Sequence, residues 1–147
     1  MNVYRITQIQ FTNSLTASGL AARWNYGGSF VIYTAESRSL ACLENLVHRS
    51  GEGRNDLFKI MVIEIPDKLL VEKIELASLK KNWNSIENYP YCQSLGNKWL
   101  NDNNSCILQL PSVVMKQEHN YLINPQHPDF AKIKLRGKED FDFDKRF

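Results

Sequence analysis

Apolar and polar residues alternate along several short segments, and this alternation predicts strands. The strongest such segment is 57–65, which ends at Pro66. Its apolar side chains fall on both faces, with Phe58, Ile60 and Val62 on one face and Met61, Ile63 and Ile65 on the other. Two apolar faces indicate a strand that is covered on both sides. Similar segments predict further strands at 3–6, 29–34, 106–110 and 121–123, and residues 139–147 are compatible with a last edge strand.

A different spacing, in which apolar residues recur every three to four positions, predicts two helices. The first follows Ser37 or Ser39, either of which can cap it, and Gly51 and Gly53 are expected to end it. Its apolar residues are Leu40, Leu43, Leu46 and Val47. The second helix covers residues 90–100, with Pro90 in its first turn.

The resulting order of elements is an α+β pattern rather than a repeated strand–helix–strand unit. Residues 13–28 are rich in Ser, Thr, Gly and Asn and predict a loop, and residues 124–129 predict a rigid turn. The chain contains no repeat and no linker, so residues 1–147 are predicted to form one compact domain. It also lacks the glycine-rich motifs that hold phosphates, so any nucleotide must be held in another way.

Composition and charge exclude several classes of protein. The net charge is +2 with both signs mixed along the chain, which argues against a dedicated nucleic-acid binder. No apolar run approaches the roughly 20 residues that span a bilayer, and no signal pattern opens the chain, so we expect a cytoplasmic protein. Three separated cysteines predict reduced thiols, and the three histidines form no metal-binding pattern.

Two charged residues are candidates for chemistry. Arg23 precedes Trp24, Asn25 and a glycine pair in the predicted loop, where a guanidinium is suited to phosphate. Alternatively, Arg23 stacks on Trp24 and pairs with a surface carboxylate. Glu44 lies at the rim of the apolar stripe of the first helix, where a carboxylate needs a partner unless it reaches solvent.

Two uncharged residues lie where strands end. Tyr33 is near the end of the strand that leads into the first helix, and Ser112 follows Pro111 at the end of another strand. A sheet fixes the position of such groups well. Their ordinary roles would be a core aromatic residue and a turn former.

Taken in order, these segments resemble the RES-domain family of bacterial toxins, which is named for an arginine, a glutamate and a serine. Arg23, Glu44 and Ser112 supply those three residues. Ala22 and Asn97 depart from a glycine and an aspartate that are usual in the family. The segments that carry the resemblance are 3–6, 22–25, 31–37, 39–48, 65–67, 96–100, 110–112, 118–128 and 143–146.

The resemblance implies a fold like that of ADP-ribosyltransferases, with a split mixed or antiparallel sheet and flanking helices around a cleft for NAD⁺. It implies that NAD⁺ is the substrate rather than a cofactor, and that its nicotinamide–ribose bond is cleaved with water or phosphate as acceptor. The implied catalytic residues are Arg23, Tyr33, Glu44 and Ser112. Arg23 would hold the phosphates or the nicotinamide–ribose side, and Tyr33 would stack on or hydrogen-bond the nicotinamide. Glu44 would stabilise the ribosyl cation, and Ser112 would bind the ribose or orient Glu44. The implied NAD⁺-binding residues are Arg23, Trp24, Asn25, Tyr33 and Ser112.

Two other functions stay open at this point. The same cleft would serve an ADP-ribosyltransferase that modifies a host protein, or a non-catalytic module that binds a nucleotide or a partner. The resemblance also implies an Xre-type protein antitoxin that covers the cleft, and a homodimer is a further expectation. An RNA-cleaving toxin lacks support, because no basic patch with interleaved aromatic residues occurs.

Overall fold

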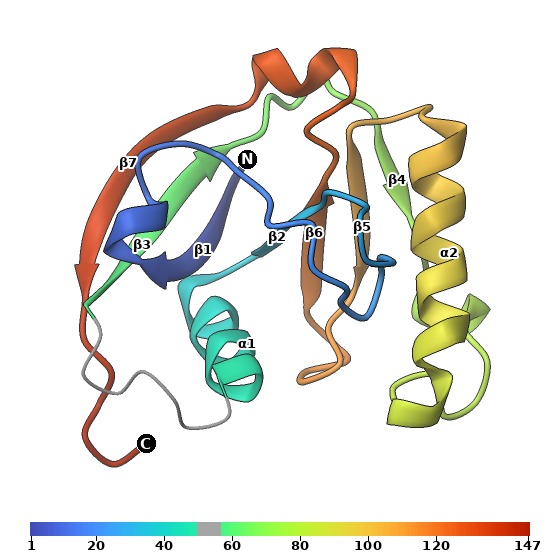
Figure 1. The fold of residues 1–147 in the computed structure, drawn as a ribbon, viewed down its shortest axis with the longest axis horizontal. Helices are drawn as coiled ribbons and strands as arrows, with labels where there is room; N and C mark the ends of the chain where they lie inside the picture. The colour runs from blue at the N-terminus through green and yellow to red at the C-terminus, as the bar shows by residue number, and fades with distance from the viewer. Residues whose placement is uncertain (50–56) are drawn as a thin grey trace.

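The computed structural model describes residues 1–49 and 57–147, and within them seven strands form one sheet in the order β4-β5-β6-β2-β1-β3-β7 (Figure 1). The strands are β1 (Asn2–Gln8), β2 (Ile32–Ala35), β3 (Phe58–Glu64), β4 (Val71–Lys73), β5 (Ile107–Pro111), β6 (His119–Ile123) and β7 (Lys134–Phe141). The helices are α1 (Arg38–Arg49) and α2 (Tyr89–Asp102), and the short 3-10 turns are Ile9–Phe11, Leu76–Ser78, Ile86–Asn88 and Pro128–Lys132.

The sheet consists of two halves that are barely joined. Strands β1, β3 and β7 form one half, and β4, β5, β6 and β2 form the other. In the part of the chain that the structure describes, the halves pair at one position, Tyr4 of β1 opposite Ala35 of β2. Neighbouring strands are antiparallel except β4 and β5, which are parallel. The predicted α+β class with a split mixed sheet is therefore confirmed.

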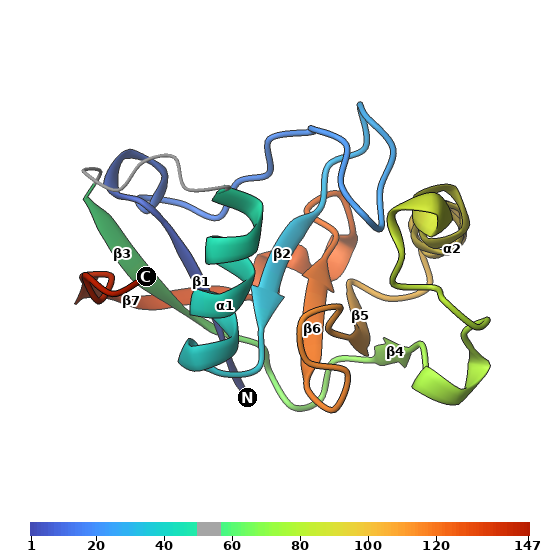
Figure 2. The same cartoon turned by 90° about the horizontal axis from the view of Figure 1, so that it is seen from below.

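Both helices cover the same face of the sheet. Alternate residues of a strand point to opposite faces, so the contacts of successive residues show which face the helices cover. On β2, Tyr33 and Ala35 point to the helices and Ile32 to the other face. Helix α1 buries Leu40 against the half that contains β1 and β3. Helix α2 buries Trp99 against the half that contains β5 and β6. Figure 2 shows α1 beside β1 and β2, and α2 beyond β5.

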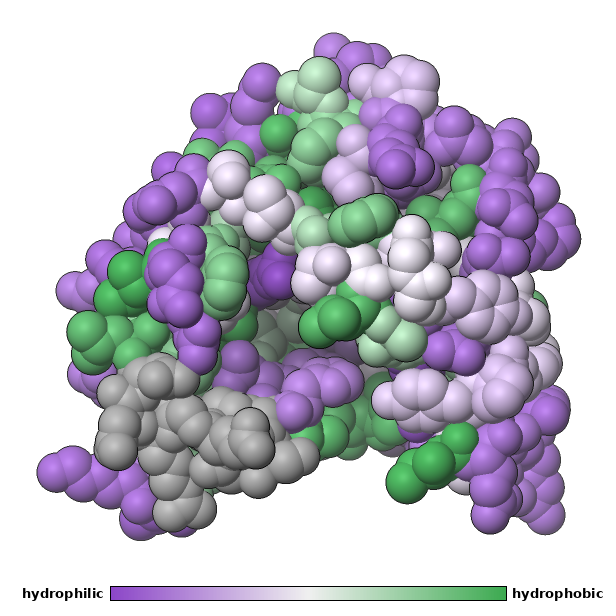
Figure 3. Space-filling view, viewed as in Figure 1, coloured by the Kyte–Doolittle hydropathy of each residue, from purple (hydrophilic) through white to green (hydrophobic). Residues whose placement is uncertain are grey.

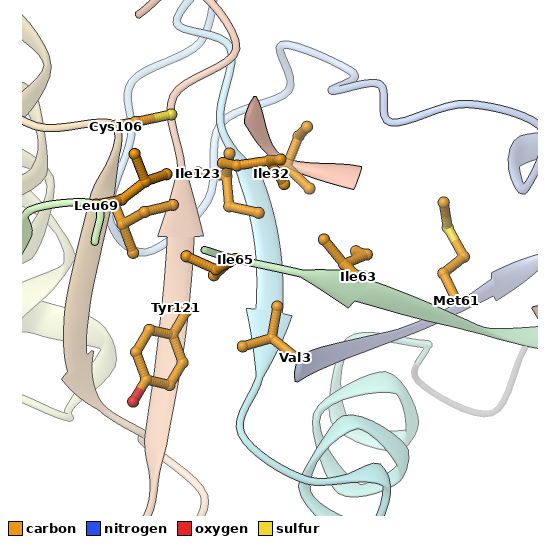
Figure 4. Close-up of a cluster of buried hydrophobic side chains, with 11 residues drawn as sticks. Val3, Ile32, Met61, Ile63, Ile65, Leu69, Cys106, Tyr121 and Ile123 are labelled. Atoms are coloured by element: carbon orange, nitrogen blue, oxygen red, sulfur yellow. The ribbon is translucent and has the colours of Figure 1, made fainter. Parts of the chain in front are cut away.

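The opposite face carries an apolar cluster that spans both halves of the sheet (Figure 4). Met61 and Ile63 come from one half, and Ile32 and Ile123 from the other, and none of these four side chains is exposed. Phe58 and Ile60 pack instead against α1. The two apolar faces that were predicted for residues 57–65 are thus confirmed.

Some element boundaries differ from the predictions. Strand β2 begins at Ile32 rather than at residue 29, because the carbonyl of Ser29 accepts a hydrogen bond from Asn25 within the preceding loop. The last strand runs over Lys134–Phe141 rather than 139–147, and β4 was not predicted. The predicted turn at 124–129 continues into a 3-10 turn. Gly51 and Gly53 lie outside the described residues.

Candidate functional site

Glu44 is held by two donors from the opposite side of the site. Its Oε1 accepts hydrogen bonds from Ser112 Oγ at 2.7 Å and from Asn120 Nδ2 at 2.7 Å. Its Oε2 has one close neighbour among the described residues, His48 Nε2 at 3.6 Å. The Glu44 side chain is 19% exposed. One carboxylate oxygen is therefore fixed by the protein, and the other is available to a ligand.

The local folding of each segment explains this geometry. Leu40 is buried under the sheet, and Glu44 follows it by one helical turn, which places the carboxylate at the edge of the same face. Ser112 lies just after β5. Its hydroxyl accepts hydrogen bonds from the amide N–H groups of Val114 and Met115 and donates one to Glu44. Asn120 is fixed by its place in β6.

Glu44 remains ionised although it is largely buried. Burial acts to raise the pKa of its carboxyl group. The contacts with His48, Ser112 and Asn120 favour the charged form and outweigh burial, so the pKa lies below its usual value. The site thus presents a fixed negative charge.

A pocket opens beside this carboxylate. Its volume is about 160 Å³, and it is lined by residues of β1, β2, β6 and α1 that include Arg5, Tyr33, Glu44, His48 and Asn120. Engineered cavities of about 150 Å³ hold one benzene ring. A pocket of this volume fits a single six-membered ring, and a longer ligand would extend outside it. The face seen in Figure 3 is hollowed near its middle.

Arg5 is a pocket residue that the sequence analysis missed. Its Nη1 donates to the carbonyl of Thr16 at 2.8 Å, and no carboxylate of the described residues forms an ion pair with it. Burial lowers the pKa of its guanidinium, but an arginine in a protein stays protonated. The pocket therefore contains a positive charge that has no counter-ion among the described residues.

Two amide groups of the pocket have an unused acceptor. Asn45 Nδ2 donates to the carbonyl of Ile6, and Asn120 Nδ2 donates to Glu44. The Oδ1 atoms of Asn45 and Asn120 are buried, and neither has a hydrogen-bond partner in the described part of the chain. A buried acceptor without a partner is costly, so these oxygens favour a ligand that carries hydroxyl or amide donors.

Tyr33 joins the pocket to the loop that precedes β2. The ring lines the pocket, and its hydroxyl donates to Asn25 Oδ1 at 2.6 Å and accepts from Trp24 N at 3.2 Å. Burial raises the pKa of this phenol, so it stays neutral. Asn25 in turn donates to the carbonyls of Leu20, Tyr26 and Ser29. These hydrogen bonds of Asn25 hold the loop in its conformation.

Arg23 lies elsewhere. Its guanidinium donates to the carbonyls of Trp83, Asn84 and Ser85 at 3.1 to 3.2 Å, and it stacks over the ring of Tyr89 at 4.3 Å. It is not among the residues that line the Glu44 pocket. Trp24 is buried against Trp83 in the core under α2. The structure thus brings Tyr33, Glu44 and Ser112 together and leaves Arg23 and Trp24 outside this group, so their predicted contacts with NAD⁺ stay predictions.

No group of three or more His, Cys, Asp or Glu side chains in the described part of the chain could hold a metal ion. Within that part of the chain the three cysteines form no disulfide. Among residues 1–49 and 57–147, no helix has the length and apolar character needed to span a bilayer.

Several known proteins are similar to this chain in sequence. A family model described as "RES domain" matches residues 2–144. A protein of Sphingobium sp. named "Prs ADP-ribosylating toxin" is 36% identical over 126 residues, which are 84% of this chain and 78% of that protein. A "Toxin Res" of Pseudomonas putida is 34% identical over 137 residues, which are 92% of this chain and 89% of that protein.

The fold is also similar to that of a chain in the crystal structure of the MbcT–MbcA toxin–antitoxin complex of M. tuberculosis. The TM-score is 0.79 at 17% sequence identity, and the match covers 96% of this chain and 84% of that chain. The family model covers nearly the whole sequence, and two relatives exceed 30% identity over most of it. This chain therefore belongs to the RES domain family.

Proposed function

We propose that this chain is a toxin that cleaves the nicotinamide–ribose bond of NAD⁺. The observation that carries the proposal is the fixed carboxylate of Glu44, whose Oε2 has only the longer contact with His48 among the described residues, beside a pocket that fits one six-membered ring. Nicotinamide is such a ring, and in NAD⁺ it is cationic. A fixed carboxylate attracts that cation in the ground state and stabilises the positive charge that moves to the ribose as the bond breaks.

The other pocket residues fit the rest of this substrate. Arg5 supplies a positive charge that forms no ion pair within residues 1–49 and 57–147, and the diphosphate of NAD⁺ would provide a counter-ion. The unpaired oxygens of Asn45 and Asn120 would accept hydrogen bonds from the ribose hydroxyls or the carboxamide. Ser112 orients Glu44. Arg23 acts from outside the pocket. Its guanidinium bonds to the carbonyls of Trp83, Asn84 and Ser85 and so fixes the loop before β2, which carries Arg23 itself.

Chromatography of NAD⁺ incubated with the purified protein tests this proposal. We expect loss of NAD⁺ with release of nicotinamide, and a decrease of roughly 100-fold or more for Glu44→Gln, since the carboxylate acts electrostatically. Glu36→Gln is the matched control, because Glu36 also pairs with a histidine, His119 at 3.2 Å, but does not line the pocket. Glu44→Gln with activity within a few-fold of wild type would contradict the role of Glu44. Phosphate added to a parallel reaction would reveal whether it serves as acceptor.

A second candidate is transfer of ADP-ribose to a protein. It is favoured by the relative from Sphingobium, whose name describes an ADP-ribosylating toxin. The chemistry at Glu44 is the same, and the acceptor differs. Incubation of cell extract with NAD⁺ labelled in the adenine would distinguish the two, because transfer leaves the label on a protein and cleavage leaves it on free ADP-ribose.

An antitoxin is the partner that we propose for this chain. The support is the fold shared with a chain of a toxin–antitoxin complex and the relatives named as toxins. The Xre type of that antitoxin and a homodimer rest on the family resemblance. Expression of the chain alone should arrest growth, and Glu44→Gln should relieve the arrest. Light scattering of the purified protein would measure the oligomeric state.

A further inference from the structure

His48 is a polar pocket residue whose side chain is held by few contacts. It lies one helical turn beyond Glu44, lines the same pocket, and is 62% exposed. Its Nε2 is 3.6 Å from Glu44 Oε2, which is longer than an N–H···O hydrogen bond. Among the described residues, Glu44 is the one side-chain partner of this ring. Its imidazole therefore borders the free carboxylate oxygen and remains accessible to solvent.

The proposed reaction requires a group that accepts a proton. When nicotinamide departs, water must attack the ribosyl C1′ and lose a proton. Glu44 is a poor base, because hydrogen bonds hold the pKa of its carboxyl group below the usual value against the effect of burial. The acceptor must therefore be another pocket side chain.

The remaining polar groups of the pocket do not accept protons. Arg5 stays protonated, and the hydroxyl of Tyr33 is neutral and already bonded to the loop. Tyr4 is a phenol, and Asn45 and Asn120 are amides. Among the described residues that line the pocket, this leaves the imidazole of His48, and histidine is the side chain that acts most often as a general base.

We propose that His48 is the general base that activates the attacking water, an inference that rests on the proposed function. The bond between C1′ and the nicotinamide nitrogen breaks, and its electron pair leaves with neutral nicotinamide. A lone pair of the water oxygen forms the new C1′–O bond, and one O–H bond breaks as His48 takes the proton. The imidazolium forms beside the Glu44 carboxylate, which stabilises it, and then releases the proton to solvent.

Two assays on the same protein separate this role from a structural one. Hydrolysis of NAD⁺ needs the proton transfer, whereas exchange of labelled nicotinamide into NAD⁺ only reverses the first step. His48→Ala should lower hydrolysis by roughly 100-fold, the usual effect of losing a general base, and should keep exchange within a few-fold. Added imidazole should restore hydrolysis, because it can occupy the vacated space. His48→Gln should be as slow as His48→Ala, since an amide is not a base.

The control is His119→Ala, which removes the other histidine that pairs with a glutamate but lies outside the pocket. It should hydrolyse and exchange like wild type. Equal losses of hydrolysis and exchange in His48→Ala, normal hydrolysis in that variant, or recovery in His48→Gln would each overturn the role of His48 and leave NAD⁺ cleavage standing. A wild-type protein that neither hydrolyses NAD⁺ nor exchanges nicotinamide would overturn the proposed function as well.

Discussion

At the scale of single residues, several polar side chains of the pocket use only some of their hydrogen-bonding atoms within the described residues. Glu44 uses one oxygen for Ser112 and Asn120 and keeps the other free. Arg5 uses one nitrogen for a carbonyl. Such half-used groups are rare in a folded interior, and their concentration around one pocket of ring size is what distinguishes it from the other hollows of the surface.

Arg5→Gln tests the positive side of the pocket. If Arg5 binds the diphosphate, the loss of a charge-assisted hydrogen bond, about 1.5–3 kcal/mol, should raise KM for NAD⁺ by roughly 10- to 100-fold. Inhibition by free nicotinamide, which has no phosphate, should not change. Arg136→Gln, which removes an exposed arginine paired with Glu64, is the control. An unchanged KM together with a lower melting temperature would mean that Arg5 serves the fold through Thr16.

Ser112→Ala tests the hold on Glu44 through pH. The hydroxyl donates to the charged carboxylate, so its loss should raise the pKa of Glu44 and move the acid limb of the kcat/KM profile to higher pH. Stability should follow the same sign. A carboxyl group whose pKa is lowered on folding stabilises the protein at pH values above 4.5, the ordinary pKa of the group. This stabilisation is lost as the pH falls through the lower pKa of the folded state.

The stability difference between wild type and Ser112→Ala should therefore be largest at neutral pH and shrink in acid. Urea unfolding at several pH values would measure it. Ser94→Ala, which removes an exposed hydroxyl bonded to a helix carbonyl, is the control and should shift neither profile. An acid limb that stays in place would argue against the contact between Ser112 and Glu44.

At the scale of elements, the loop before β2 is held by close packing on α2. Gly96 of α2 lies so near this loop that an added Cβ would come within 1.7 Å of the Trp24 carbonyl oxygen. The same loop carries Arg23, Asn25 and the hydrogen bonds to Tyr33. The backbone of α2 thus sets the position of one wall of the pocket.

Gly96→Ala should destabilise the protein by about 3 kcal/mol or more, because backbone atoms cannot give way as a flexible side chain can. For a chain of this size we expect the melting temperature to fall by roughly 10 °C. Gly137→Ala is the matched control, since nothing lies within 4 Å of its Cβ position. Equal thermal unfolding of the two variants would contradict the close contact.

The elements also show which parts of the fold and of the site could be predicted from the sequence. The spacing of apolar residues identified α1 and β3, which are long and strongly periodic. It missed β4, which has three residues, and misplaced β7, whose alternating charged positions resemble a surface segment. Glu44 and Ser112 were candidates because of their places at a helix rim and a strand end, but only the family resemblance put them in one site, because no local pattern shows that residues 68 positions apart meet. Arg5 was missed, since one charge in a short strand reads as a solvent-facing residue.

At the scale of the whole molecule, the apolar cluster behind the sheet connects two halves that share one paired position. Ile63→Ala removes a fully buried side chain from that cluster and should cost about 2–5 kcal/mol. Because the cluster spans both halves, unfolding should remain a single transition at a lower urea concentration. Val62→Ala, on the opposite face and partly exposed, should cost less. Two separate transitions, only one of them shifted, would mean that the halves unfold independently.

The distance along the chain between Glu44 and the residues that hold it has a consequence for synthesis. Ser112 and Asn120 follow Glu44 by 68 and 76 positions. On a translating ribosome the carboxylate is made long before the groups that fix it, and a contact of such long range cannot form until both partners have emerged. The nascent chain therefore carries an unassembled site through most of its production, and the carboxylate is fixed only after nearly all of the chain has been made.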